Sequence, residues 1–201
     1  MQFLETIKAL EAHYGTPRPA AIRKVATRLT PEYRRWIMAS RFCVVSTVGP
    51  DGSDGSPRGD DGPVVHELDE STLALPDWAG NNRIDTLRNI VADGRMSLMF
   101  FVPGSNNVVR VNGTGRVTAD DDMRARFERD GKLPRTVTIM QIGEIYSQCA
   151  RAIMRAGLWT ADDESGNVPK IGAILAAMTD GEEGGDAYDI AWPERAKKTL
   201  W

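Results

Sequence analysis

The chain has 201 residues, with 25 Lys and Arg against 28 Asp and Glu, and carries a formal net charge of −3. This nearly balanced charge produces no overall field that would attract nucleic acid or an anionic membrane, so any anion-binding site must be local. Its two cysteines exclude a disulfide framework or a cysteine-based zinc site, and no uncharged apolar run reaches the roughly 20 residues of a membrane helix. We therefore expect a cytoplasmic protein without nucleic-acid or membrane partners and without a bound metal ion.

The first forty residues are predicted to form an N-terminal helical extension, residues 1–40. Apolar residues recur at helical spacing in its first segment and predict an amphipathic helix: Phe3, Leu4, Ile7, Leu10 and Tyr14. A second helical stretch is expected from about Ala20. Thr30 and Pro31 are typical of a helix cap and a first helical residue, so a third helix is expected to follow them.

Residues 41–148 are predicted to form the core of the domain, because the apolar pattern changes there to that of strands. Six strands are expected, at residues 42–48, 64–68, 72–75, 96–102, 107–117 and 136–147. Residues 51–62 are rich in Asp and Gly and favour a structured turn. Two helices, at 82–92 and 120–129, interrupt the strands without alternating regularly with them, which favours an α+β fold with a mainly antiparallel barrel.

After Cys149 the pattern becomes helical again, so residues 149–201 are expected to form a C-terminal helical region. An acidic, glycine-rich loop is predicted within it at residues 180–189.

Three segments of the core combine a cation with a polar or backbone-exposing neighbour. In Ser56-Pro57-Arg58-Gly59-Asp60 the planar guanidinium of Arg58 could donate two hydrogen bonds to a phosphate. The alternative for this segment is a solvated arginine in a loop.

The second segment runs from Leu75 through Pro76 and Asp77 to Asn82 and Arg83. With Asn82 as a helix cap and Arg83 in the first turn, the unpaired N–H groups of a helix start would form an anion site. A capped helix with an exposed arginine would explain the same residues.

The third segment, residues 107–113, alternates so that Arg110 lies on the strand face opposite to Val109 and Val111. Arg110 would then point either into a polar cleft or to the surface.

Taken in order, these segments resemble the FMN-binding, pyridoxamine-phosphate-oxidase-like flavoproteins. The resemblance extends through Cys149-Ala150-Arg151-Ala152 and Leu158-Trp159, and so covers most of the chain from about residue 21. It implies a six-stranded FMN-binding split barrel with flanking helices, dimerised so that FMN lies in a cleft lined by both subunits.

The resemblance also implies roles for particular residues. Arg83 would grip the flavin phosphate, with Asn82 and the Ser56 to Arg58 segment nearby. Pro76 and Asp77 would approach the isoalloxazine ring. Arg110 and Trp159 would complete the pocket, from the same subunit or its partner, and the helical region 149–201 would complete the dimer and the cofactor site.

The sequence departs from true pyridoxamine-phosphate oxidases in ways that argue against that reaction. Asp60-Asp61-Gly62-Pro63-Val64-Val65 replaces the family's more usual Asp-x-Pro-Gly-Phe, and the C-terminus lacks the Arg-Leu-x-Pro ending. We therefore expect an FMN-dependent oxidoreductase for an unidentified small molecule, with NAD(P)H as a candidate electron donor and no assigned catalytic side chain. The alternatives are a non-catalytic flavin or tetrapyrrole carrier on the same barrel and a dimeric interaction module with an empty pocket.

Overall fold

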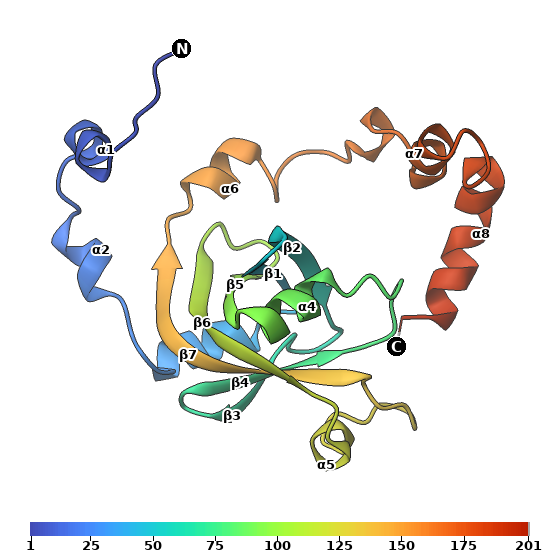
Figure 1. Ribbon diagram of the computed structural model, residues 1–201, viewed down its shortest axis with the longest axis horizontal. Coiled ribbons are helices and arrows are strands. Elements are labelled where there is room, and N and C mark those ends of the chain that lie inside the picture. Colours follow the sequence, from blue (N-terminus) through green and yellow to red (C-terminus); the bar gives the residue numbers. More distant parts are fainter. Residues whose placement is uncertain (201) are drawn as a thin grey trace.

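A computed structural model describes residues 1–200 and shows a strongly curved antiparallel sheet surrounded by short helices (Figure 1). The seven strands are β1 (Phe42–Gly49), β2 (Gly52–Gly59), β3 (His66–Asp69), β4 (Thr72–Asp77), β5 (Arg95–Phe101), β6 (Val108–Thr118) and β7 (Thr136–Gln148). They are hydrogen bonded in the order β2-β1-β5-β6-β7-β4-β3, and every pairing is antiparallel. The predicted α+β split-barrel fold is confirmed.

The core of the barrel follows from the two-residue period of the strands. Cys43, Val45 and Thr47 on β1 point inward and are buried, while the residues between them lie on the outer face. The inward residues of β5, β6 and β7 meet them in one apolar cluster that includes Leu98, Phe100, Val111 and Ile145. Burial of this cluster supplies the main driving force for folding.

The predicted number of six strands is wrong, because residues 52–59 form β2 instead of part of a turn. Glycine, aspartate and proline disfavour strands, and this segment contains little else. It is tolerated because β2 lies at the end of the sheet and pairs only with β1. Pro57, opposite Val44, can therefore leave its missing N–H on the unpaired side.

The sheet curls until β2 approaches the end of β4, but these two strands are not hydrogen bonded to each other. A side-chain ion pair between Arg58 on β2 and Asp77 at the end of β4 spans this opening instead. The barrel is therefore split along one seam, and the seam is bridged by charge instead of by a backbone ladder.

Helix α3 (Pro31–Met38) is capped as predicted, since the Thr30 hydroxyl accepts a hydrogen bond from the Tyr33 N–H at 3.3 Å. Helix α4 (Asp85–Ala92) begins three residues later than expected. The reason is that Asn82 adopts a left-handed conformation with φ of 62°, which an α-helix cannot contain. The expected helix over 120–129 is confined to α5 (Asp121–Ala125).

Two helical arms extend away from the barrel (Figure 1). The first holds α1 (Ile7–Tyr14) and α2 (Pro19–Arg23), and the second holds α6 (Arg151–Ala156), η1 (Ser165–Asn167), α7 (Ile171–Met178) and α8 (Gly185–Lys198). The loop predicted over 180–189 is shorter than expected, because α8 begins at Gly185. No helix within residues 1–200 combines the length and apolar character needed to cross a bilayer.

We predict that Gly113→Ala destabilises the barrel. Gly113 lies at a register shift between β6 and β7, where an added Cβ would lie 2.0 Å from the backbone oxygen of Gln141. Overpacking of this kind costs about 1–3 kcal/mol. Urea denaturation should show the loss for Gly113→Ala and a much smaller change for Gly55→Ala on β2, where an added Cβ meets nothing within 4 Å. Equal stability of the two variants would contradict the close packing at the register shift.

Candidate functional site

A cleft of about 870 Å³ opens along the seam of the barrel. Its walls come from β2 and the residues after it, from the end of β4 with the loop that follows, and from the start of β7. Six of the eight residues predicted for the site line this cleft: Ser56, Arg58, Pro76, Asp77, Asn82 and Arg83. The volume lies in the range of small-molecule and cofactor sites.

Arg58 and Asp77 form the floor of the cleft. Their side chains are only 24% and 17% exposed, and the guanidinium Nη1 of Arg58 donates a hydrogen bond to Oδ1 of Asp77. A charge that is largely removed from water requires a partner of opposite sign, which each of these residues supplies to the other. Arg58 is therefore held in one position before any ligand arrives.

The loop between β4 and α4 carries Asn81, Asn82 and Arg83. The Asn81 carboxamide accepts a hydrogen bond from the Arg83 N–H at 3.0 Å, which forms a local turn. The Arg83 Nε donates to the Asp85 carboxylate at 2.6 Å, and this bond raises the pKa of the guanidinium. The predicted helix-cap role of Asn82 and first-turn position of Arg83 are therefore wrong: both residues precede the helix.

Helix α4 fixes this loop to the barrel. The buried Thr86 hydroxyl donates to Asp54 on β2, and Asn89 donates to the Thr47 hydroxyl on β1 at 3.2 Å. Ile90 is buried in the core beneath them. The position of Arg83 thus depends on contacts made by the helix that follows it.

Arg135 and Thr136 line the cleft as well, and sequence reasoning missed both. The backbone N–H of Arg135 donates to the Asp77 carbonyl oxygen at 2.8 Å, and its guanidinium Nη1 donates to the Asn82 carboxamide oxygen. The signal that could have revealed Arg135 is the one used for Arg58, namely a cation next to a strand. The sequence alone did not show that Arg135 reaches the cleft, because only the pairing of β4 with β7 places it there.

A second loop closes the rim of the cleft. Arg129, which follows α5, contacts the carboxylates of Asp60 and Asp61 at 2.8 Å each and lies over the Trp78 ring at 5.9 Å. His66 packs against Phe127 in the same region, with ring centroids 4.8 Å apart, and burial lowers its pKa. His66 is therefore favoured in its neutral form.

Two polar atoms in the cleft lack hydrogen-bond partners within residues 1–200. They are the Nε of Arg58 and the hydroxyl oxygen of Thr136, and both are buried. Buried donors are nearly always satisfied in a folded protein, so such atoms indicate a group that the cleft is built to receive.

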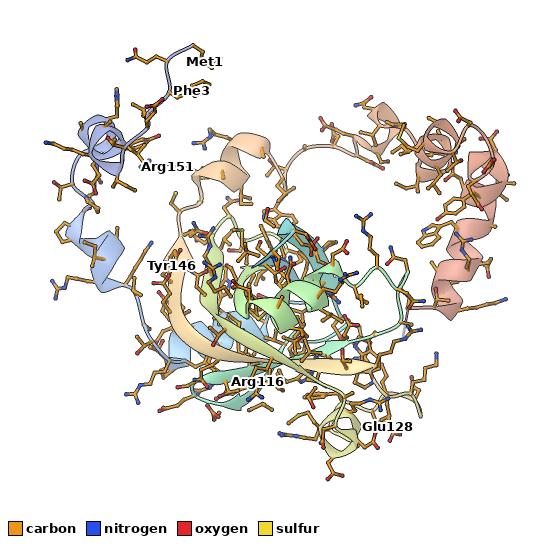
Figure 2. The ribbon with its side chains drawn as sticks, viewed as in Figure 1. Met1, Phe3, Arg116, Glu128, Tyr146 and Arg151 are labelled. Carbon is orange, nitrogen blue, oxygen red and sulfur yellow. The ribbon has the colours of Figure 1, made fainter. Side chains whose placement is uncertain are left out.

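The structure does not bring Arg110 and Trp159 to the cleft within one chain. Arg110 lies on the outer face of β6 and donates to the Tyr146 hydroxyl at 3.1 Å. Figure 2 places Tyr146 on the side of β7 that faces α2. Trp159 donates from Nε1 to the Ser105 carbonyl oxygen at 2.8 Å. A role for either residue in the cleft of a partner subunit stays a prediction.

The Cys43 thiol, which lies near Arg58, is held in its protonated form. Burial raises the pKa of the Cys43 thiol to about 12, and the nearby charge of Arg58 opposes this effect only in part. No group of three or more His, Cys, Asp or Glu side chains suited to a metal ion occurs in the described part of the chain. The guanidinium groups that line the cleft can form ion pairs and hydrogen bonds with an anion.

Comparison with known protein families agrees with this architecture. The model for pyridoxamine 5'-phosphate oxidase matches residues 29–149, which include all seven strands. The chain belongs to the pyridoxamine 5'-phosphate oxidase-like family. Among curated protein sequences, none is significantly similar to it.

Solved structures share the fold of this family member at low sequence identity. A variant of HupZ from Group A Streptococcus is 18% identical, with a TM-score of 0.50 over 59% of this chain and 98% of its own. A candidate pyridoxamine 5'-phosphate oxidase from Lactobacillus delbrueckii is 24% identical, with a TM-score of 0.49 over 60% of this chain and 95% of its own. Identities this low show the fold alone.

We predict that Cys43 does not react with iodoacetamide at pH 8 while the protein is folded. Its side chain is buried and its raised pKa keeps the thiol protonated. Peptide mass spectrometry should find Cys43 unmodified in the native protein and modified once urea is added. Rapid modification of native Cys43 would show that the β1 face is open to solvent.

Proposed function

We propose that this protein binds FMN in the seam cleft. The observation that carries the proposal is the convergence of three arginines, Arg58, Arg83 and Arg135, on one cleft of nucleotide-ligand size. These side chains come from three segments of the chain, and guanidinium groups are the preferred protein donors to phosphate.

The residues present fit such a ligand. A phosphate requires charge-assisted donors, which Arg83 and its neighbours supply at the exposed end of the cleft. An isoalloxazine ring requires an apolar wall and a few fixed hydrogen bonds, and Leu75 with Pro76 would form that wall.

The proposed activity is that of an FMN-dependent oxidoreductase acting on a small molecule. Bound FMN supplies electron transfer through its ring, and the protein binds it, orients it and limits water. The side chains around the cleft suit this division of roles, since Cys43 is protonated and Asp77 and Asp85 are engaged in ion pairs. Because these groups are not free to act as an acid or a base, they also favour the second candidate, a flavin or tetrapyrrole carrier that performs no reaction.

We further propose that the protein is a homodimer joined through the outer face of β1, β5, β6 and β7. Val44, Met99, Arg110 and Tyr146 form one row across these four strands, and the next row holds the Phe42 and Phe101 rings, 5.9 Å apart. A partner that covers this face would bury the aromatic rings.

Binding of FMN is tested by titration of the purified protein, followed by flavin fluorescence. We expect tight binding to the native protein and a loss of about tenfold or more for Arg83→Ala, the usual effect of removing a charged hydrogen-bond donor. Arg95→Ala is a matched control, because Arg95 also pairs with a nearby carboxylate, Asp93, at 2.6 Å and lies outside the cleft. Equal FMN affinity of the two variants would remove Arg83 from the site.

A reduction test on the FMN-loaded protein then distinguishes an oxidoreductase from a carrier. Bleaching of the 450 nm region by NADH or NADPH, and its return under air, would support the oxidoreductase. A bound flavin that neither nucleotide reduces would support the carrier, and a native protein that never takes up FMN would exclude flavin binding.

The dimer is tested by light scattering after size-exclusion chromatography. We expect about twice the 22.1 kDa mass of the chain. Phe42→Asp should yield the monomer, because a charge would be buried in the apolar face. Val91→Asp on α4 is the control, since Val91 is 76% exposed and lies outside that face. A native protein that elutes as a monomer would refute the dimer.

A further inference from the structure

Arg135 differs from the other two arginines of the cleft in its charge environment. Arg58 is paired with Asp77, and Arg83 is paired with Asp85. Arg135 makes no salt bridge within residues 1–200, and its guanidinium donates only to the neutral carboxamide of Asn82. Of the three cleft arginines, Arg135 is therefore the one whose charge has no ion-pair partner among the described residues.

The position of Arg135 is nevertheless well defined. It stands directly before β7, and the next residue, Thr136, is paired with Asp77 in the β4–β7 ladder. The Arg135 N–H also donates to the Asp77 carbonyl oxygen at 2.8 Å. Arg135 thus projects from the end of the β4–β7 strand pairing, whereas Arg83 lies on a loop; both side chains are exposed.

Arg135 also determines which part of Asn82 is available to a ligand. The carboxamide oxygen of Asn82 accepts the hydrogen bond from Arg135, so its two N–H donors remain for other acceptors. The left-handed backbone at Asn82, with φ of 62°, keeps this side chain at the cleft. Two adjacent groups of the cleft wall therefore have donors that remain available to a ligand.

We propose that Arg135 is the residue that makes this cleft select a phosphorylated ligand over its uncharged counterpart. Applied to the proposed FMN site, on which this inference rests, Arg135 would contact the phosphate directly and favour FMN over riboflavin. A phosphate monoester carries about −1.5 to −2 charges at pH 7. Arg58 and Arg83 are already balanced by Asp77 and Asp85, so the uncompensated cation contributes most to the preference for a dianion.

A purely structural role for Arg135 has a different consequence. If Arg135 only held Asn82 and the following loop in place, its loss would distort the whole cleft. Phosphorylated and unphosphorylated flavins would then lose affinity together. The ratio of FMN affinity to riboflavin affinity therefore separates ligand contact from loop support.

The test is a titration of the native protein, Arg135→Gln and Arg135→Lys with FMN and with riboflavin. We expect the native protein to prefer FMN, and we expect Arg135→Gln to lose about tenfold or more in FMN affinity while its riboflavin affinity stays within about twofold. Arg135→Lys should recover part of the preference, because it keeps the charge but not the planar fork. Arg116→Gln, on an exposed residue of β6 (Figure 2), should match the native protein with both ligands.

The outcomes distinguish this inference from the proposal that the cleft binds flavin. A native protein that binds neither flavin overturns both. If the native protein binds FMN but Arg135→Gln leaves the ratio of FMN affinity to riboflavin affinity unchanged, only the role of Arg135 is overturned. This holds whether both affinities fall together or both stay the same. Should Arg135→Gln fail to fold, Arg135→Lys still decides: a ratio of FMN affinity to riboflavin affinity below that of the native protein supports ligand contact, and an unchanged ratio overturns it.

Discussion

The ion pair between Arg58 and Asp77 is the interaction on which the site depends. It joins β2 to the end of β4, which the backbone ladder leaves unconnected, and it forms the floor of the cleft at the same point. Because both side chains are mostly buried, neither can lose its partner cheaply. The seam therefore stays bridged without being filled, and the space beside the bridge becomes a ligand site in a barrel whose interior is otherwise closely packed.

The charges around the cleft are arranged before any ligand arrives. Asp77 and Asp85 hold Arg58 and Arg83 in place, which lowers the cost of ordering these long side chains when an anion binds. The same carboxylates reduce the net attraction for that anion. Arg135 is fixed by β7, and within residues 1–200 its guanidinium is hydrogen bonded only to Asn82, so its charge restores this attraction. Arg58 and Arg83 are thus held in place before the ligand binds, whereas Arg135 supplies the net positive charge. Three unpaired arginines in one site could not be preorganised in this way without strong mutual repulsion.

Sequence patterns predicted the elements well where one periodicity dominated. The strands from β4 to β7 and the capped helix α3 follow from alternating or capped apolar patterns and were found within a few residues. The failures are local and have one cause. β2 is made of residues that disfavour strands, and Asn82 takes a backbone conformation that delays the start of α4. In each case contacts with distant residues, β1 for the strand and Arg135 for the loop, outweigh the local preference.

By itself the sequence determined the class of fold and six of the residues that line the cleft, because strand periodicity and the placing of arginine beside proline, glycine and asparagine are local properties of the chain. It could not determine that Arg135 belongs to the cleft or that Arg110 and Trp159 lie elsewhere in the same chain. Those facts depend on which strands pair and on how far the sheet curls. Pairing partners distant in sequence bring Arg135 within reach of Asn82, and only tertiary structure contains that information.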